Sequence, residues 1–175
     1  GSDASTITIT IKPIPQVPMA SVDAISCETQ DLNLYATTVN SATYQWNGPN
    51  GFTSTEQNPV ITNASTSNNG IYTVKSIQNG CESSESSVVV AINPLPNFTL
   101  DEYCEGNVYS LTATIDNSLS PLPDYTYSWT GPENYSNNQN PIIITGLPTG
   151  TYSLTVTDNL GCSVTKDIPV LQTLC

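Results

Sequence analysis

The sequence predicts an all-β protein made of two tandem β-sandwich modules, and three observations support this fold class. Apolar and polar residues alternate with a period of two along many short runs, such as 6–11 and 152–156, as strands with one buried face require. Turn-forming pairs such as Asn79-Gly80 separate these runs. The chain also repeats itself, with offsets of 77 from Cys27 to Cys104 and 83 from Trp46 to Trp129.

The repeat consists of short motifs that occur in the same order in both halves of the chain. The first copy contains Cys27-Glu28, Tyr44-Gln45-Trp46-Asn47-Gly48-Pro49, Gln57-Asn58-Pro59, Gly70-Ile71-Tyr72 and Asn79-Gly80-Cys81. The second contains Cys104-Glu105, Tyr127-Ser128-Trp129-Thr130-Gly131-Pro132, Gln139-Asn140-Pro141, Gly150-Thr151-Tyr152 and Leu160-Gly161-Cys162. Each copy therefore defines one structural module.

The ends of the copies predict the domain boundaries. Residues 9–15 parallel residues 90–96 at an offset of 81, so residues 3–15 are interpreted as the terminal strand and linker of a preceding repeat, or as an extra strand on module one. Module one is expected over residues 16–93 and module two over 98–172, joined by a Pro-rich linker at 94–97 that favours an extended, semi-rigid link. Cys175 follows a strand as Cys104 does, so residues 173–175 are interpreted as the start of the next repeat.

The strand pattern narrows the fold to an immunoglobulin-like sandwich. Strands at intervals of about 8–12 residues with a tryptophan in the third strand are typical of this fold. Gly70-Ile71-Tyr72 and Gly150-Thr151-Tyr152 resemble the tyrosine corner that opens strand F. We expect Trp46 and Trp129 to be core residues. The cysteine usual two positions after the tyrosine is replaced by Val74 and Leu154, and a cysteine occurs instead in the predicted F–G turn.

Composition excludes several functional classes. With 3 Lys plus Arg against 15 Asp plus Glu, the chain has a net charge of −12 and no basic patch for nucleic acid or anionic lipid. The absence of histidine removes the usual base of nucleophilic triads and dyads, and no pair of carboxylates is singled out by spacing, so we expect no enzyme. The longest apolar run has five residues, which predicts no transmembrane helix and no signal peptide within this sequence.

Five cysteines without histidine or a CxxC spacing favour structural disulfides over a zinc site. One disulfide per module, Cys27–Cys81 and Cys104–Cys162, would leave Cys175 as a free thiol. The A–B and F–G turns of an immunoglobulin topology, however, lie at opposite ends of a strand about 23 Å long, too far apart for an S–S bond. Either the topology differs, or Cys27 bonds Cys162 across the modules.

Two weaker sets of site residues remain. Phe52 and Tyr135 follow the Gly-Pro turns and are candidates for exposed aromatic side chains that contact a ligand, although packing over the sandwich edge is the alternative. Clustered carboxylates could bind calcium through oxygen ligands, and the candidates are Asp101, Glu102, Asp124 and Asp158. None of them forms a spaced calcium loop, and no other cofactor is expected.

The motifs resemble a known class of repeats. The stretch from Tyr125 through Trp129, Gly146 and Gly150-Thr151-Tyr152 to Gly161-Cys162 resembles the SprB-type repeat of gliding-motility adhesins of Bacteroidetes. Module one is similar to the immunoglobulin-like and PKD-like repeats of the same proteins. The resemblance covers roughly residues 20–172. It implies export by type IX secretion and display on the outer cell surface, and it provides no catalytic residues.

The predicted function is therefore structural. We expect a disulfide-braced stalk or spacer in a large adhesin, monomeric and secreted, that serves surface adhesion or gliding. Its expected partners are the neighbouring repeats of the same polypeptide, with surface glycans, a host or a substratum as further possibilities. The alternative is a carbohydrate-binding β-sandwich module of a secreted protein.

Overall fold

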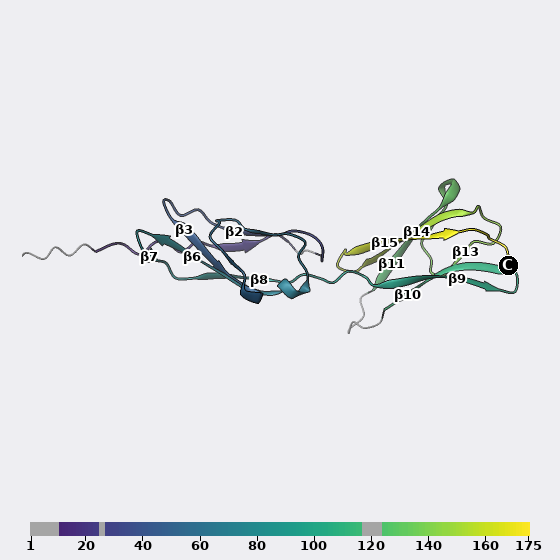
Figure 1. Ribbon diagram of the computed structural model, residues 1–175, viewed down its shortest axis with the longest axis horizontal. Helices are drawn as coiled ribbons and strands as arrows, with labels where there is room; N and C mark the ends of the chain where they lie inside the picture. Colours follow the sequence, from purple (N-terminus) through teal and green to yellow (C-terminus); the bar gives the residue numbers. More distant parts are fainter. Residues whose placement is uncertain (1–10, 25–26, 117–123) are drawn as a thin grey trace, which may run out of the picture. The chain divides into compact units, whose positions relative to one another are not determined.

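The computed structural model describes residues 11–24, 27–116 and 124–175. The chain divides into two compact units, unit one (Gly1–Ile92) and unit two (Asn93–Cys175). The division falls between β8 and β9, one residue before the predicted end of module one at residue 93 (Figure 1).

Unit one consists of two antiparallel sheets that enclose one core. The first sheet has the order β1-β2-β5, and the second has the order β4-β3-β6, with β7 and β8 both paired to β6. The strands of the first sheet are β1 (Ala20–Val22), β2 (Leu32–Ala36) and β5 (Val60–Ile61). Those of the second sheet are β3 (Thr43–Asn47), β4 (Thr53–Ser54), β6 (Gly70–Gln78), β7 (Cys81–Glu82) and β8 (Ser86–Val90).

Unit two repeats this arrangement with longer outer strands. Its first sheet has the order β13-β10-β9 and its second the order β12-β11-β14-β15, again antiparallel throughout. The first sheet contains β9 (Phe98–Glu105), β10 (Val108–Ile115) and β13 (Ile142–Ile143). The second contains β11 (Tyr125–Thr130), β12 (Ser136–Asn137), β14 (Gly150–Asp158) and β15 (Ser163–Val170).

Both units have the strand order of an immunoglobulin-like sandwich. In each unit the first, second and fifth strands along the chain, equivalent to A, B and E, form one sheet. The remaining strands, equivalent to C, C′, F and G, form the other. The predicted fold class, all-β with two tandem immunoglobulin-like modules, is confirmed.

Alternation of side chains places the core of each unit between its two sheets. Trp46 and Trp129 are fully buried, as predicted for a tryptophan on the third strand. On β14, Tyr152, Leu154 and Val156 are buried while the residues between them are half-buried. Since a slip of one residue would turn this apolar set outward, the alternation fixes the strand registers.

The segment before β1 is attached to unit one. Lys12 Nζ donates a hydrogen bond to the Asn79 carbonyl at 2.7 Å, and Ser76 Oγ donates to the Gln16 carbonyl at 2.7 Å. Pro15 is buried, yet residues 11–19 form no regular strand. Of the predicted segment 3–15, residues 3–10 lie outside the described residues, and 11–15 do not form the extra strand considered for module one.

The C-terminal residues belong to unit two. Thr173 is buried, and its Oγ1 donates to the Leu147 carbonyl at 2.9 Å. Residues 173–175, expected to begin a following repeat, therefore pack on unit two. In the described parts of the chain, no helix has both the length and the apolar character needed to cross a membrane.

Candidate functional site

The motifs shared by the two halves of the chain meet at one corner in each unit. In unit one, the hydroxyl of the buried Tyr72 on β6 donates to the Asn68 carbonyl at 2.9 Å. The ring of Phe52 packs edge-on against Tyr72, with 5.4 Å between centroids and an interplanar angle of 67°. Burial raises the pKa of Tyr72 above the ordinary tyrosine value. The predicted tyrosine corner is present.

Unit two builds the same corner from the second copy of the motifs. Tyr152 donates to the Pro148 carbonyl at 2.9 Å, and Tyr135 packs on it with 5.5 Å between ring centroids and an angle of 68°. Phe52 and Tyr135, the predicted ligand-contacting aromatics, are thus half-buried rings held against the corner tyrosines. This placement is the packing alternative, and it explains why an aromatic residue follows each Gly-Pro turn.

The two buried tryptophans differ in one hydrogen bond. Trp46 Nε1 donates to the Gln57 carbonyl at 3.2 Å, whereas Trp129 Nε1 is buried with no hydrogen-bond partner among the described residues. Asn58 follows Trp46 by 12 positions, but Asn140 follows Trp129 by only 11. We attribute the difference to this shorter loop, which does not place a carbonyl at the indole N–H.

Replacing each tryptophan by phenylalanine should therefore have unequal costs. Trp46→Phe should destabilise unit one by about 1–2 kcal/mol more than Trp129→Phe destabilises unit two, because only the first leaves a carbonyl without its donor. Urea unfolding followed through the amide NMR signals of β6 and β14 reports the units separately. Equal costs, or a larger cost in unit two, would contradict the explanation.

Four of the five cysteines are disulfide-bonded, and their pairing differs from the predicted one. Cys104 is bonded to Cys175, with 5.8 Å between their Cα atoms, and Cys81 is a free thiol. Cys27 and Cys162 are also disulfide-bonded. The within-module pairs Cys27–Cys81 and Cys104–Cys162 are therefore wrong, and so is the free thiol at Cys175. The alternative pairing of Cys27 with Cys162 stays a prediction.

The topology explains why Cys104 does not bond Cys162. Cys104 pairs with Tyr109 at the start of β10, while Cys162 follows β14, whose end pairs with the start of β11. These positions lie at opposite ends of a strand of eight residues, about 26 Å long. After β15 the chain passes the loop between β13 and β14, where Gly146 N donates to the Thr173 carbonyl at 3.3 Å, and so reaches Cys104.

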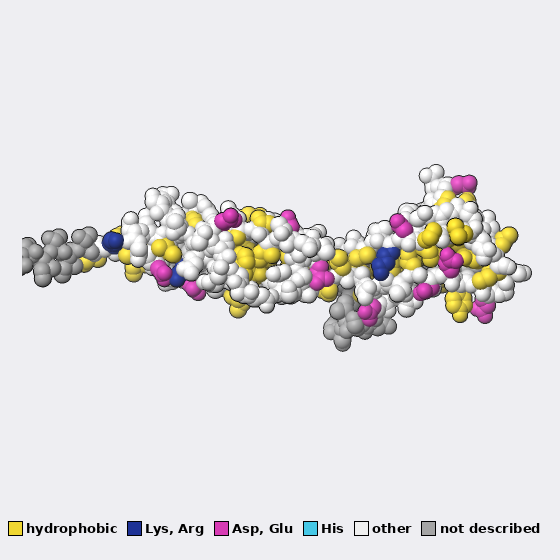
Figure 2. Space-filling model, viewed as in Figure 1, with side chains coloured by type: hydrophobic (Ala, Val, Ile, Leu, Met, Phe, Trp, Pro, Cys, Tyr) yellow, Lys and Arg dark blue, Asp and Glu magenta, His cyan; other side chains and the backbone are white. Residues whose placement is uncertain are grey.

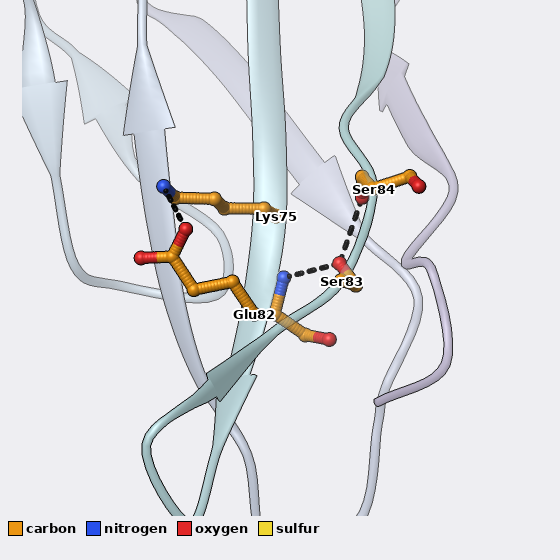
Figure 3. Close-up of polar contacts among 5 residues, drawn as sticks. Lys75, Glu82, Ser83 and Ser84 are labelled. Atoms are coloured by element: carbon orange, nitrogen blue, oxygen red, sulfur yellow. Dashed lines mark hydrogen bonds and ion pairs between the residues drawn. The ribbon is translucent and has the colours of Figure 1, made fainter. Parts of the chain in front are cut away.

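The free thiol lies in the β6–β7 hairpin of unit one, where Cys81 is half-exposed. Figure 3 shows polar contacts of the residues that follow it in the chain: Lys75 Nζ forms an ion pair with Glu82 at 2.7 Å. The Ser83 hydroxyl accepts a hydrogen bond from the Ser76 amide at 3.0 Å and donates one to the Ser84 carbonyl at 2.7 Å. These contacts hold the chain in place as it turns from β7 into β8.

The four carboxylates considered for calcium do not form a site. Among the described residues, no group of three or more acidic, histidine or cysteine side chains is placed to hold a metal ion. Asp101 accepts from the Thr99 hydroxyl at 3.2 Å, and Glu102 accepts from the Tyr109 hydroxyl. Asp124 is exposed just before β11. The calcium hypothesis for these residues is therefore not supported by their placement.

Asp158 has a structural role instead. Its side chain is almost fully buried, and Oδ1 accepts from the amides of Leu160 at 2.9 Å and Cys162 at 2.8 Å. The carboxylate thereby closes the turn between β14 and β15. Burial first, and then the negative charge of Asp158, raise the pKa of the neighbouring Tyr125.

One polar pair in unit two was not predicted from the sequence. Glu102 and Tyr109 lie on β9 and β10, and their hydrogen bond raises the pKa of the Tyr109 hydroxyl more than its burial does. The signal was present in Gly106-Asn107, a turn pair that brings the residues on either side into a hairpin.

The comparisons with known proteins return structural likenesses alone. No protein-family model and no curated protein matches the chain. Murine CEACAM1b is 12% identical, with 86% of this chain and 98% of that chain covered at a TM-score of 0.43. The three N-terminal domains of the highly immunogenic outer capsid protein of bacteriophage RB49 are 16% identical, with 87% and 59% covered at a TM-score of 0.37.

The amphioxus IgVJ-C2 molecule is 16% identical, with 85% of this chain and 100% of that chain covered at a TM-score of 0.36. Likenesses this distant carry no argument about ligands or partners. The immunoglobulin-like fold of each unit follows from its own strand order and registers.

Proposed function

We propose that the chain is a structural repeat segment of a large bacterial cell-surface adhesin, in which it acts as a stalk or spacer without catalytic activity. The observation that carries the proposal is the repetition of one complete unit. Both units have the same strand order, and both have the same corner of a Gly-Pro turn, an edge-on aromatic ring and a buried tyrosine. A tandem array of such units extends the length of a protein without adding catalytic groups.

Chemistry and composition support the extracellular setting. Disulfides occur mainly in proteins of oxidising compartments, and four of the five cysteines here are bonded. The chain has 10% charged residues, below the roughly 25% of average soluble domains, with Ser, Thr and Asn in their place. These features support an extracellular setting, and the resemblance to SprB-type repeats further implies export by type IX secretion, display on the outer cell surface and a role in adhesion or gliding.

The carbohydrate-binding alternative has less support. It relied on Phe52 and Tyr135 as exposed stacking platforms, and both rings are packed on the corner tyrosines. Sugars stack on aromatic faces that are open to solvent, so neither ring is presented for that purpose. The spacer therefore remains the better proposal.

A replacement experiment in the parent adhesin tests the proposal. In cells that display the adhesin, residues 16–172 are either deleted or replaced by two immunoglobulin-like modules of unrelated sequence and similar length. Because a spacer contributes length, we expect the replacement to retain surface adhesion and the deletion to reduce it. Surface display is checked with an antibody against a distal part of the adhesin. A replacement that abolishes adhesion as fully as the deletion would overturn the spacer proposal.

A further inference from the structure

Unit two has two long strands at the edges of its sheets, and they are protected differently. β15 lies at the edge of one sheet and contains Pro169, which discourages pairing with another strand, while the side chain of its Lys166 lies over the Phe98 ring of β9. β9 lies at the edge of the other sheet, also has eight residues, and contains neither lysine nor proline. In unit one the corresponding strand, β1, has only three residues. Lys166 covers the beginning of this edge, because its Nζ donates a hydrogen bond to the Phe98 carbonyl. From Leu100 to Cys104, β9 is paired with β10 on one side, and no other described strand lies on its free side.

The register shows which backbone groups this edge presents. The amide of Asp116 donates to the Asn97 carbonyl at 2.9 Å, so the odd-numbered residues of β9 direct their N–H and C=O groups toward β10. The even-numbered residues consequently direct theirs away from the sheet. Leu100, Glu102 and Cys104 therefore offer a row of donors and acceptors along the free edge.

The side chains around this edge combine carboxylates with exposed apolar surface. Tyr103 is 62% exposed on the outer face of the sheet, between Asp101 and Glu105 on the same face. In the register Ser110 lies opposite both Tyr103 and Ile143, and Ile143 is 64% exposed. Figure 2 shows Asp and Glu side chains (magenta) next to hydrophobic ones (yellow) over the part of unit two where Figure 1 places β9.

A cleft lies on the inner side of the same strand. Its volume is about 290 Å³, and it is lined by Glu102, Tyr109, Pro169, Leu171 and Gln172. The Glu102 carboxylate, held by the Tyr109 hydroxyl, provides a negative end. Leu171 and Pro169 provide an apolar wall, so the cleft suits an alkyl chain that ends in a positive charge.

We propose that the free edge of β9 binds an extended, lysine- or arginine-bearing segment of a partner protein, which adds to the sheet as a further strand. Backbone hydrogen bonds to Leu100, Glu102 and Cys104 hold the segment. Its basic side chains on the outer face pair with Asp101 and Glu105, and one on the inner face enters the cleft toward Glu102. This binding role goes beyond the proposed spacer function and does not depend on it.

Charge decides between this occupant and a second copy of the chain. The chain has 15 acidic and 3 basic side chains, and a second β9 strand would bring the same three carboxylates to the edge. Like charges placed opposite one another destabilise strand pairing. A basic segment converts each of these repulsions into an attraction.

A peptide titration on the whole chain tests the proposal. The probe is a capped seven-residue peptide of alternating lysine and valine, and NMR follows the amide signals of the protein. We expect the signals of Leu100, Glu102 and Cys104 to shift, with slower hydrogen exchange of their amides. Raising the salt concentration from about 0.1 M to about 1 M shortens the screening length from about 10 to about 3 Å and should weaken binding at least about tenfold.

Matched controls separate strand addition from simple charge attraction. A peptide of the same sequence with alternate amides N-methylated keeps its charge but loses its donors, and should not bind. The pair of changes Asp101→Asn and Glu105→Gln should weaken binding several-fold, whereas Asp167→Asn, which removes a carboxylate from β15, should leave it unchanged. Absence of shifts on β9, equal binding of the N-methylated peptide, or an equal effect of Asp167→Asn would overturn the proposal. So would self-association of the chain through β9, detected by sedimentation without peptide.

Discussion

Replacing Cys104 and Cys175 together by serine should lower the free energy of unfolding of unit two by about 4 kcal/mol. The disulfide closes a loop with a sequence separation of 71 residues. In the chain-entropy model, a cross-link of this span lowers the entropy of the unfolded chain, and the loss corresponds to about 4 kcal/mol of stability. An effect of this size is comparable with the whole stability of many small domains. The variant should therefore be partly unfolded at moderate temperature.

Urea unfolding with Trp129 fluorescence in a Trp46→Phe background measures this cost in unit two alone. Cys81→Ser is the matched control and should leave the unfolding midpoint of unit two unchanged, because Cys81 is a free thiol in unit one. In the native unreduced chain, a thiol reagent should modify Cys81 and spare the other four cysteines. Modification of Cys175, or a peptide linking Cys27 to Cys81, would contradict the disulfide arrangement.

Gly48→Ala should destabilise unit one by about 1–3 kcal/mol, the usual cost of forcing extra volume into a packed core. A Cβ at Gly48 would lie 2.5 Å from Cδ1 and Cε1 of Tyr72. The ring cannot move aside easily, because its hydroxyl is bonded to the Asn68 carbonyl and Phe52 packs on its face. Gly131→Ala should have a similar effect in unit two, where the corresponding distance to Tyr152 Cδ1 is 2.7 Å.

A double-mutant cycle checks the cause. In a Tyr72→Leu background the added methyl group no longer meets a ring, so Gly48→Ala should cost clearly less than in the native chain. The measurement is urea unfolding followed through the amide signals of β6. An equal cost in both backgrounds would mean that the glycine is required for a reason other than the close approach of Tyr72.

The features predicted correctly from the sequence are those encoded by neighbouring residues. Alternation on β14 determines which side chains are buried, and the Gly-x-Tyr motif places the corner tyrosine. The tryptophan of the third strand is buried in both units for the same reason. Such patterns act within one strand or one turn, so they can be recognised without knowing the tertiary structure.

The features predicted wrongly depend on which loops and chain termini lie at the same end of the sandwich. Cys104 and Cys162 are the counterparts of Cys27 and Cys81 in the repeat pattern, which suggested one disulfide per module, yet they lie at opposite ends of unit two. The bond to Cys175 depends on the path of residues 171–175, which contain no pattern that indicates where they return. For Phe52 and Tyr135 the sequence left both ligand contact and packing open, because the choice depends on the position of a tyrosine on a strand distant in sequence.

The bond between Cys104 and Cys175 also determines how unit two would respond to tension. A pulling force applied at residues 93 and 175 travels along the backbone to Cys104 and then crosses directly to Cys175 through the sulfur atoms. The 70 residues from 105 to 174 form a closed loop that carries no load. Fully extended, that loop would measure about 240 Å, a length that unit two can release only after the disulfide is reduced. An oxidising environment therefore makes this unit nearly inextensible.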